Sequence, residues 1–152
     1  MKWLTFSLLL LLSTFITAQD YSTLVAEGEK LYASKDFAQS AIKYKEAFNF
    51  QKNNASDLYN ASCSAALSGD AKTAMEWLQL SFKNGWINSN HMTSDSDLTS
   101  LHGTDEWNNL VSEMEKIAAR IEASYDQPLK AELIQIFNDD QAIRHEYINA
   151  QK

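Results

Sequence analysis

The feature that most constrains this chain is a set of residues that recurs at a spacing of 34 positions between Leu24 and Lys83. The matching positions carry mostly small or apolar side chains. They are Gly28, Leu31, Lys35-Asp36-Phe37, Ala41, Tyr44 and Ala47, followed by Ser62, Ala65, Gly69-Asp70-Ala71, Met75, Leu78 and Ser81. A fixed period of this length is typical of paired helices that stack on one another. The spacing therefore predicts two helical hairpins within residues 19–85.

The composition agrees with a helical chain. Among 152 residues there are one proline, four glycines and one cysteine, while alanine, leucine, glutamate, lysine and glutamine are abundant and favour helix. A single cysteine allows no internal disulfide. We therefore expect an all-α fold that is stabilised by the packing of its helices.

Apolar residues at helical spacing give the expected order of elements. Four helices are predicted at residues 21–33, 37–50, 56–67 and 71–83. A capping segment over residues 86–124 should follow, with a helix that is capped by Thr104 or Asp105, runs to about Ser124 and covers the exposed face of the last hairpin. The residues expected to provide this cover are Leu98, Leu101, Trp107, Leu110 and Met114. A long C-terminal helix should occupy residues 125–152, capped by Asp126 and with Pro128 in its first turn.

The N-terminus is typical of an export signal. Lys2 precedes an apolar block from Leu4 to Ile16, and Ala18 precedes the polar Gln19. The block is shorter than the roughly 20 apolar residues that a membrane span needs. We therefore predict a signal peptide over residues 1–18, cleavage after Ala18, a periplasmic or secreted location, and no membrane insertion after cleavage.

The charge balance excludes some partners. Without residues 1–18 the chain has 12 basic and 20 acidic side chains, a formal charge of −8. Nucleic acids and anionic membranes require clustered lysine and arginine. We therefore expect no nucleic-acid partner.

In its hairpins the chain resembles the tetratricopeptide repeat family. The likeness rests on Gly28, Asp36-Phe37, Tyr44 and Ala47 in the first unit, and on Gly69-Asp70-Ala71, Ala74 and Leu78 in the second. The family's usual tryptophan is replaced by Leu24 and Leu58, and its terminal proline by Lys52 and Trp86. Residues 86–107 are similar to the closing segment of exported bacterial members. The resemblance implies two TPR-like repeats with a helical cap.

A second resemblance lies near the C-terminus. Residues 133–144, with Asp140-Gln141-x-x-Arg144 at their centre, are similar to the start of an uncharacterised domain that can follow such repeats. The resemblance implies that a further domain is truncated here. From its spacing alone, Asp140 with Arg144 is most simply an i,i+4 ion pair on a helix.

No catalytic or metal-binding motif is expected. His91, His102 and His145 lack the spacing of metal ligands, although His91 and Asp95 could form a remote cluster. Asp95 and Asp97 match part of a calcium loop, whose glycine is replaced by Ser100. Cys63 lies among alanines and is expected to be a buried, unreactive thiol. The sequence therefore predicts a non-enzymatic protein without a cofactor.

The tetratricopeptide resemblance implies a concave groove lined by the first helix of each pair. Its residues would be Glu29, Tyr32, Tyr59, Asn60 and Cys63, although Tyr32 and Tyr59 could equally serve packing. The leading hypothesis is an exported TPR-like scaffold that binds a protein or peptide in this groove. The alternative is an accessory region of an enzyme or ligand-binding protein whose C-terminal domain is truncated here. Self-association through the last helix is a third possibility, and the oligomeric state stays open.

Overall fold

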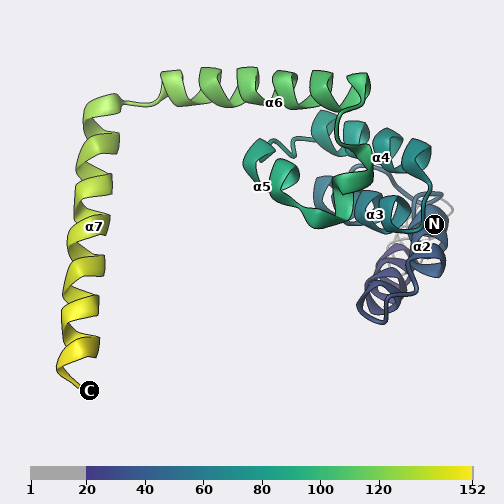
Figure 1. The fold of residues 1–152 in the computed structure, drawn as a ribbon, viewed down its shortest axis with the longest axis horizontal. Helices are drawn as coiled ribbons and strands as arrows, with labels where there is room; N and C mark the ends of the chain where they lie inside the picture. Colours follow the sequence, from purple (N-terminus) through teal and green to yellow (C-terminus); the bar gives the residue numbers. More distant parts are fainter. Residues whose placement is uncertain (1–19, 152) are drawn as a thin grey trace, which may run out of the picture. The chain divides into compact units, whose positions relative to one another are not determined.

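The computed structural model describes residues 20–151, so the predicted signal peptide and its cleavage point lie outside the described residues. Every regular element among these residues is a helix, which confirms the predicted all-α class. After a helix at residues 20–33 the elements, labelled in Figure 1, are α2 (Phe37–Ala47), α3 (Ala55–Leu67), α4 (Ala71–Lys83), α5 (Ser89–Ser94), the 3-10 helix η1 (Ser96–Leu101), α6 (Asp105–Ser124) and α7 (Gln127–Ala150).

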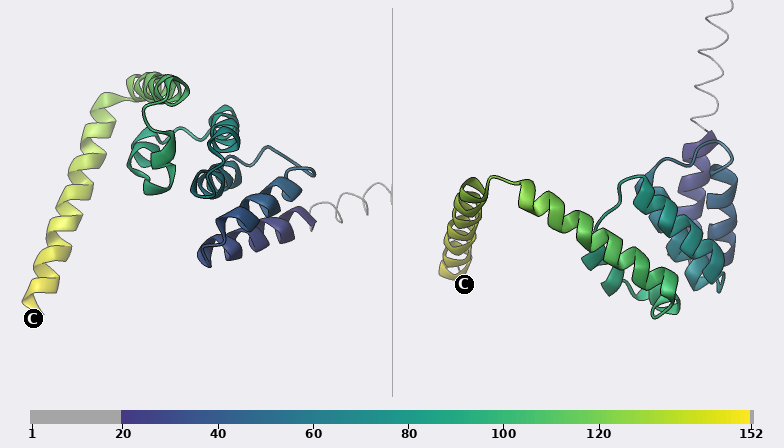
Figure 2. Two further views of the ribbon diagram at one scale, coloured as in Figure 1. Left: turned by 45° about the vertical axis from the view of Figure 1, so that its right-hand side comes forward. Right: turned by 90° about the horizontal axis from the view of Figure 1, so that it is seen from above.

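Helix α3 is the centre of the first compact unit, which ends at Glu115. It packs against α2, α4 and η1, and Figure 2 shows it beside the pair formed by residues 20–33 and α2. Six consecutive residues of α3, Ala61 to Ala66, are buried, and all of them are small. Small side chains let neighbouring helices approach closely on several sides at once. The small side chains of α3 therefore allow α2, α4 and η1 to pack against it on several sides.

The helix at residues 20–33 approaches α2 closely at Gly28. A Cβ atom added to Gly28 would lie 3.1 Å from the ring of Tyr44, which is itself only 1% exposed. Ser40 of α2 donates a hydrogen bond to the carbonyl oxygen of Gly28 over 2.8 Å and lies 2.9 Å from the hydroxyl of Ser64. These buried hydroxyls are thereby satisfied, as buried polar groups must be. Close packing at Gly28 and the hydrogen bonds of Ser40 thus hold the helix at residues 20–33, α2 and α3 together.

The turns of the two hairpins share the same backbone conformation and hydrogen-bond pattern. Lys35 and Gly69 both have positive φ, 64° and 88°. In each turn two amides donate back to the end of the preceding helix: Lys35 to Tyr32 and Asp36 to Leu31, then Gly69 to Ala66 and Asp70 to Ala65. This pattern is the Schellman motif, which normally has glycine at the left-handed position. Asp36 and Asp70 then cap the next helix through the amides of Gln39 and Thr73.

The residues predicted to cover the second hairpin are buried. Leu98 and Leu101 of η1 and Trp107, Leu110 and Met114 of α6 are each at most 5% exposed. Thr104 accepts a hydrogen bond from the amide of Trp107, which confirms it as the capping residue of α6. Met92 of α5 is also fully buried. The segment from α5 to α6 therefore contributes large side chains to a core whose centre is built from small ones.

Two details differ from the prediction. Helix α2 ends at Ala47 rather than Phe50, because Phe48, Asn49 and Phe50 form a turn closed by amides that donate to Tyr44, Glu46 and Ala47. Phe48 still packs inward, whereas Phe50 is 45% exposed. The short helix α5 was not expected. Asn88 starts it by accepting a hydrogen bond from the amide of His91.

The second compact unit comprises residues 116–152 and includes α7. Asp126 caps α7 through the amide of Leu129 and Pro128 lies in the first turn, which confirms the predicted start. No residue of α7 is buried, and its large apolar side chains, among them Phe137 and Ile143, are more than half exposed. Among the helices of residues 20–151, none has the length and apolar character that a bilayer crossing requires.

Candidate functional site

A cavity of about 230 Å³ opens on the first unit, on one side of α3. It is lined by side chains from five segments: Glu29 and Tyr32 of residues 20–33, Tyr44 of α2, Tyr59, Asn60 and Cys63 of α3, His91 of α5, and Asp95 and Asp97 at η1. On α3, positions 59, 60 and 63 share one helical face, as do positions 29 and 32 on the first helix. Helix geometry therefore directs these side chains toward the same space.

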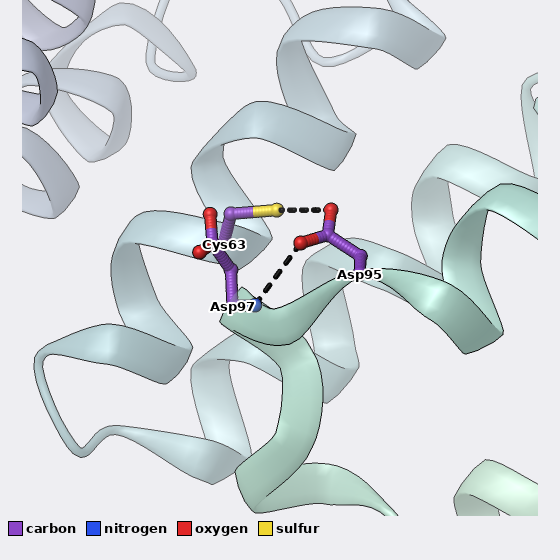
Figure 3. A group of neighbouring side chains, drawn as sticks. All are labelled: Cys63, Asp95 and Asp97. Atoms are coloured by element: carbon purple, nitrogen blue, oxygen red, sulfur yellow. Dashed lines mark hydrogen bonds between the residues drawn. The ribbon is translucent and has the colours of Figure 1, made fainter.

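Asp95 is the centre of the polar contacts. Its Oδ1 accepts the amide of Asp97 over 3.0 Å, which starts η1. Its Oδ2 accepts the hydroxyl of Tyr59 over 2.7 Å and the thiol of Cys63 over 3.7 Å. Figure 3 shows the thiol pointing at this carboxylate. The Nε2 atom of His91 lies 3.8 Å from the same oxygen. One carboxylate thus joins α3, α5 and η1.

Asp97 is held in a similar way from the other side of the cavity. The hydroxyl of Tyr32 donates a hydrogen bond to its Oδ2. Tyr32 also packs edge-on against Phe37, with ring centroids 5.5 Å apart. The two carboxylates at η1 are therefore each oriented by a tyrosine from a different helix, and the cavity keeps a fixed arrangement of acidic groups.

Tyr59 is held in place by aromatic packing. Its ring stacks on Trp86 at 4.0 Å with 14° between the planes, and His91 lies 5.5 Å away. Tyr59 is only 4% exposed. Replacing it with alanine would remove this stack, so a test of the hydroxyl alone requires phenylalanine.

The charge of the cavity is negative. Glu29, Asp95 and Asp97 line it, and among its described lining residues there is no lysine or arginine. Burial, followed by the charges of Asp95 and Asp97, raises the pKa of the Cys63 thiol. Burial and the hydrogen bond to Asp95 raise the pKa of Tyr59. Both groups are therefore neutral at ordinary pH and donate to the carboxylates.

The structure brings all five predicted groove residues to this one cavity. Glu29 and Asn60 are exposed and Tyr32 is 36% exposed, whereas Tyr59 and Cys63 are buried. Their binding of a peptide stays a prediction. The sequence pattern did not predict that Asp95, Asp97 and His91 would lie beside them. The remote pairing of His91 with Asp95 was the one available signal, and it is present at 3.8 Å.

Asp140, Gln141 and Arg144 lie in the second unit. Arg144 pairs with Asp140 over 2.6 Å on the exposed surface of α7, which confirms the expected i,i+4 ion pair. Gln141 donates to Asp140 over 3.3 Å. Such surface pairs contribute little to stability.

Comparison with known protein families gives one match. The family described as "A/B hydrolase-like, N-terminal domain" matches residues 20–122, most of the chain. The chain therefore belongs to this family, and the matched residues contain every side chain that lines the cavity. No curated protein and no solved structure matches the chain significantly.

This match corrects the predicted tetratricopeptide identity, which was wrong, together with the TPR-like repeats assigned to residues 19–85. Lys35 and Gly69, 34 residues apart, occupy the same position in the two hairpin turns, which accounts for the match of Lys35-Asp36 with Gly69-Asp70. A shared turn of this kind is general to helical hairpins and does not identify a family. The matched residues end at 122, so they give no support to the resemblance assigned to residues 133–144.

Proposed function

We propose that the chain provides a non-catalytic recognition domain to a hydrolase-like protein, and that a protein or peptide segment binds at the cavity beside α3. The family supports the accessory role, since its description names an N-terminal domain of hydrolase-like proteins. The observation that carries the proposal is the convergence of Glu29, Tyr32, Asn60 and the η1 carboxylates on one open cavity.

The rim of the cavity suits a polypeptide. Glu29 and Asn60 are exposed and line the same cavity as the aromatic side chain of Tyr32. An amide side chain can both donate and accept hydrogen bonds with a peptide backbone. Among the described residues Glu29 forms no ion pair, so its carboxylate is available to a lysine or arginine of the ligand.

The state of Cys63 supports binding rather than catalysis. A nucleophilic cysteine acts as a thiolate and is found in electropositive surroundings. The carboxylates of Asp95 and Asp97 have the opposite effect, because they and burial raise the pKa of the thiol. A protonated thiol that donates to Asp95 is a poor nucleophile.

A peptide library displayed on phage and selected on the purified chain tests this proposal. Enriched peptides should contain lysine or arginine, and their Kd can be measured by fluorescence anisotropy. Glu29→Gln and Asn60→Ala should each weaken binding about tenfold, which corresponds to about 1.4 kcal/mol.

Glu76→Gln and Asn108→Ala are the matched controls, since both residues are exposed and neither lines the cavity. They should leave the Kd unchanged. If selection enriches no sequence, or if the two rim variants bind as tightly as the controls, the proposal is wrong.

A further inference from the structure

The thiol of Cys63 on α3 and the carboxylates of Asp95 and Asp97 at η1 lie close together at the inner side of the cavity. One donor atom each from Cys63, Asp95 and Asp97 can be chosen so that all three lie within 4.8 Å of one another. Figure 3 shows the three side chains together, with the thiol of Cys63 directed at the carboxylate of Asp95. Beside them is the imidazole of His91, with its Nε2 atom 3.8 Å from Asp95. The 4.8 Å group itself contains one sulfur and two carboxylates, and His91 adjoins it at Asp95.

We propose that Cys63, Asp95 and Asp97 bind a divalent transition metal ion of the zinc type, with His91 at the fourth position. This inference goes beyond the proposed recognition of a peptide and does not depend on it, because it rests on the ligand side chains at the inner side of the cavity and not on the rim residues Glu29 and Asn60. It also departs from the expectation that the chain binds no metal.

Two of the distances between ligand atoms are close to those of a tetrahedral site. With Zn–S near 2.3 Å and Zn–O near 2.0 Å, the sulfur and oxygen of a tetrahedron lie about 3.5 Å apart. The distance from Sγ of Cys63 to Oδ2 of Asp95 is 3.7 Å. Nitrogen and oxygen ligands would lie about 3.3 Å apart, and His91 lies 3.8 Å from the same oxygen. A mixture of thiolate, imidazole and carboxylate is a donor set that zinc accepts.

The surrounding residues already orient the ligands. Tyr59 donates to Asp95, Tyr32 donates to Asp97, and the amide of Asp97 donates to the second oxygen of Asp95. Carboxylates that bind metals are commonly held by such outer hydrogen bonds. Cys63 is 5% exposed and fixed on α3. The exposed ring of His91 is the ligand with freedom to adjust its position.

Binding has a defined proton balance. In the free protein the Cys63 thiol carries its proton and donates it to Asp95. When the ion binds, a metal–sulfur bond forms and the thiol proton is released to the buffer. The two positive charges of the ion then offset most of the charge of one thiolate and two carboxylates. Affinity for the ion should therefore fall as pH is lowered.

Cobalt provides a direct test, since Co²⁺ replaces zinc and is visible in absorption spectra. The purified chain, stripped of metal and kept reduced, is titrated with CoCl₂. We expect a thiolate-to-cobalt charge-transfer band in the near ultraviolet and strong visible bands typical of tetrahedral cobalt. Addition of Zn²⁺ should bleach both.

Variants distinguish a site formed by several ligands from adventitious binding of cobalt to the thiol alone. Cys63→Ser should abolish the charge-transfer band, and Asp97→Asn and His91→Ala should each weaken cobalt binding at least tenfold. Asp139→Asn and His145→Ala, both exposed on α7, are the matched controls. Circular dichroism confirms that each variant is folded. Absence of the band in the unaltered chain, or a band that Asp97→Asn and His91→Ala leave unchanged, overturns the proposal.

Discussion

At the scale of single residues, packing contacts determine how a substitution changes stability, even where helix propensity alone predicts the opposite sign. Gly28 lies within a helix, where alanine is normally preferred by about 1 kcal/mol. Its backbone, however, faces the ring of Tyr44, which is only 1% exposed and would lie 3.1 Å from an added Cβ atom. The favourable effect of alanine on the helix should therefore be outweighed by the clash.

Gly28→Ala should lower the free energy of unfolding by about 1–3 kcal/mol, as overpacking of a core does. Chemical denaturation followed by circular dichroism measures this change. Ala26→Gly, at an exposed position of the same helix, calibrates the propensity effect and should cost about 1 kcal/mol. An increase in stability for Gly28→Ala would show that the two helices separate more easily than the contact indicates.

The buried tyrosine and thiol at the cavity predict sensitivity to alkali. The pKa of Tyr59 and that of Cys63 lie above the ordinary values of 10.0 and 9.0. Between those values and the raised ones the folded chain holds more protons than the unfolded chain. Stability is therefore complete below about pH 9 and falls as pH rises further, by up to about 1.4 kcal/mol per pH unit for each group.

Denaturant unfolding of the reduced protein across this range checks the effect. Tyr59→Phe should flatten the decline, whereas Tyr147→Phe, at an exposed site, should leave the curve as it is in the unaltered chain. An equally steep decline in Tyr59→Phe would assign the alkaline loss of stability to other groups.

At the scale of elements, the two hairpins differ at one position of an otherwise shared turn. Gly69 adopts its positive φ without a steric cost, whereas Lys35 adopts a similar conformation with a Cβ atom. The first turn is therefore strained where the second is not.

Lys35→Gly should stabilise the protein by about 0.5–1 kcal/mol, since relief of the backbone strain exceeds the added freedom of the unfolded chain. Gly69→Ala should destabilise it by a similar amount or more. No atom lies within 4 Å of a Cβ at Gly69, so its cost would come from the backbone alone. Thermal unfolding of both variants provides the measurement, and opposite signs are expected. If both substitutions destabilise, the Lys35 side chain has a stabilising contact that exceeds the strain.

Regular helices could be predicted from the sequence because their periodicity is local. The spacing of Tyr59, Asn60 and Cys63 gives a common face on α3 without any knowledge of the fold. Asp95 lies between α5 and η1 and Asp97 lies in the first turn of the short η1, where no extended period applies. Their place beside Cys63 depends on contacts across 32 or more residues. For this reason Glu29, Tyr32, Tyr59, Asn60 and Cys63 were predicted to lie together, whereas the carboxylates of Asp95 and Asp97 were not placed with them.

At the scale of the whole molecule, the fold class could be predicted and the family could not. All-α architecture follows from composition and from apolar spacing, which many families share. The departures at Leu24, Leu58, Lys52 and Trp86 concern the positions that distinguish the tetratricopeptide family, and the family match places the chain elsewhere. Secretion, the absence of catalysis, and self-association through the exposed side chains of α7 stay predictions.

The central claim is that the cavity beside α3 is where this N-terminal domain recognises a polypeptide. Chemical-shift mapping by NMR, with an enriched basic peptide added to the labelled chain, tests it most directly. We predict that the largest shifts fall on Glu29, Tyr32, Asn60 and the segment around Asp95. Shifts that instead cluster on α7, or on the side of α4 away from the cavity, would contradict the claim and assign recognition to another surface.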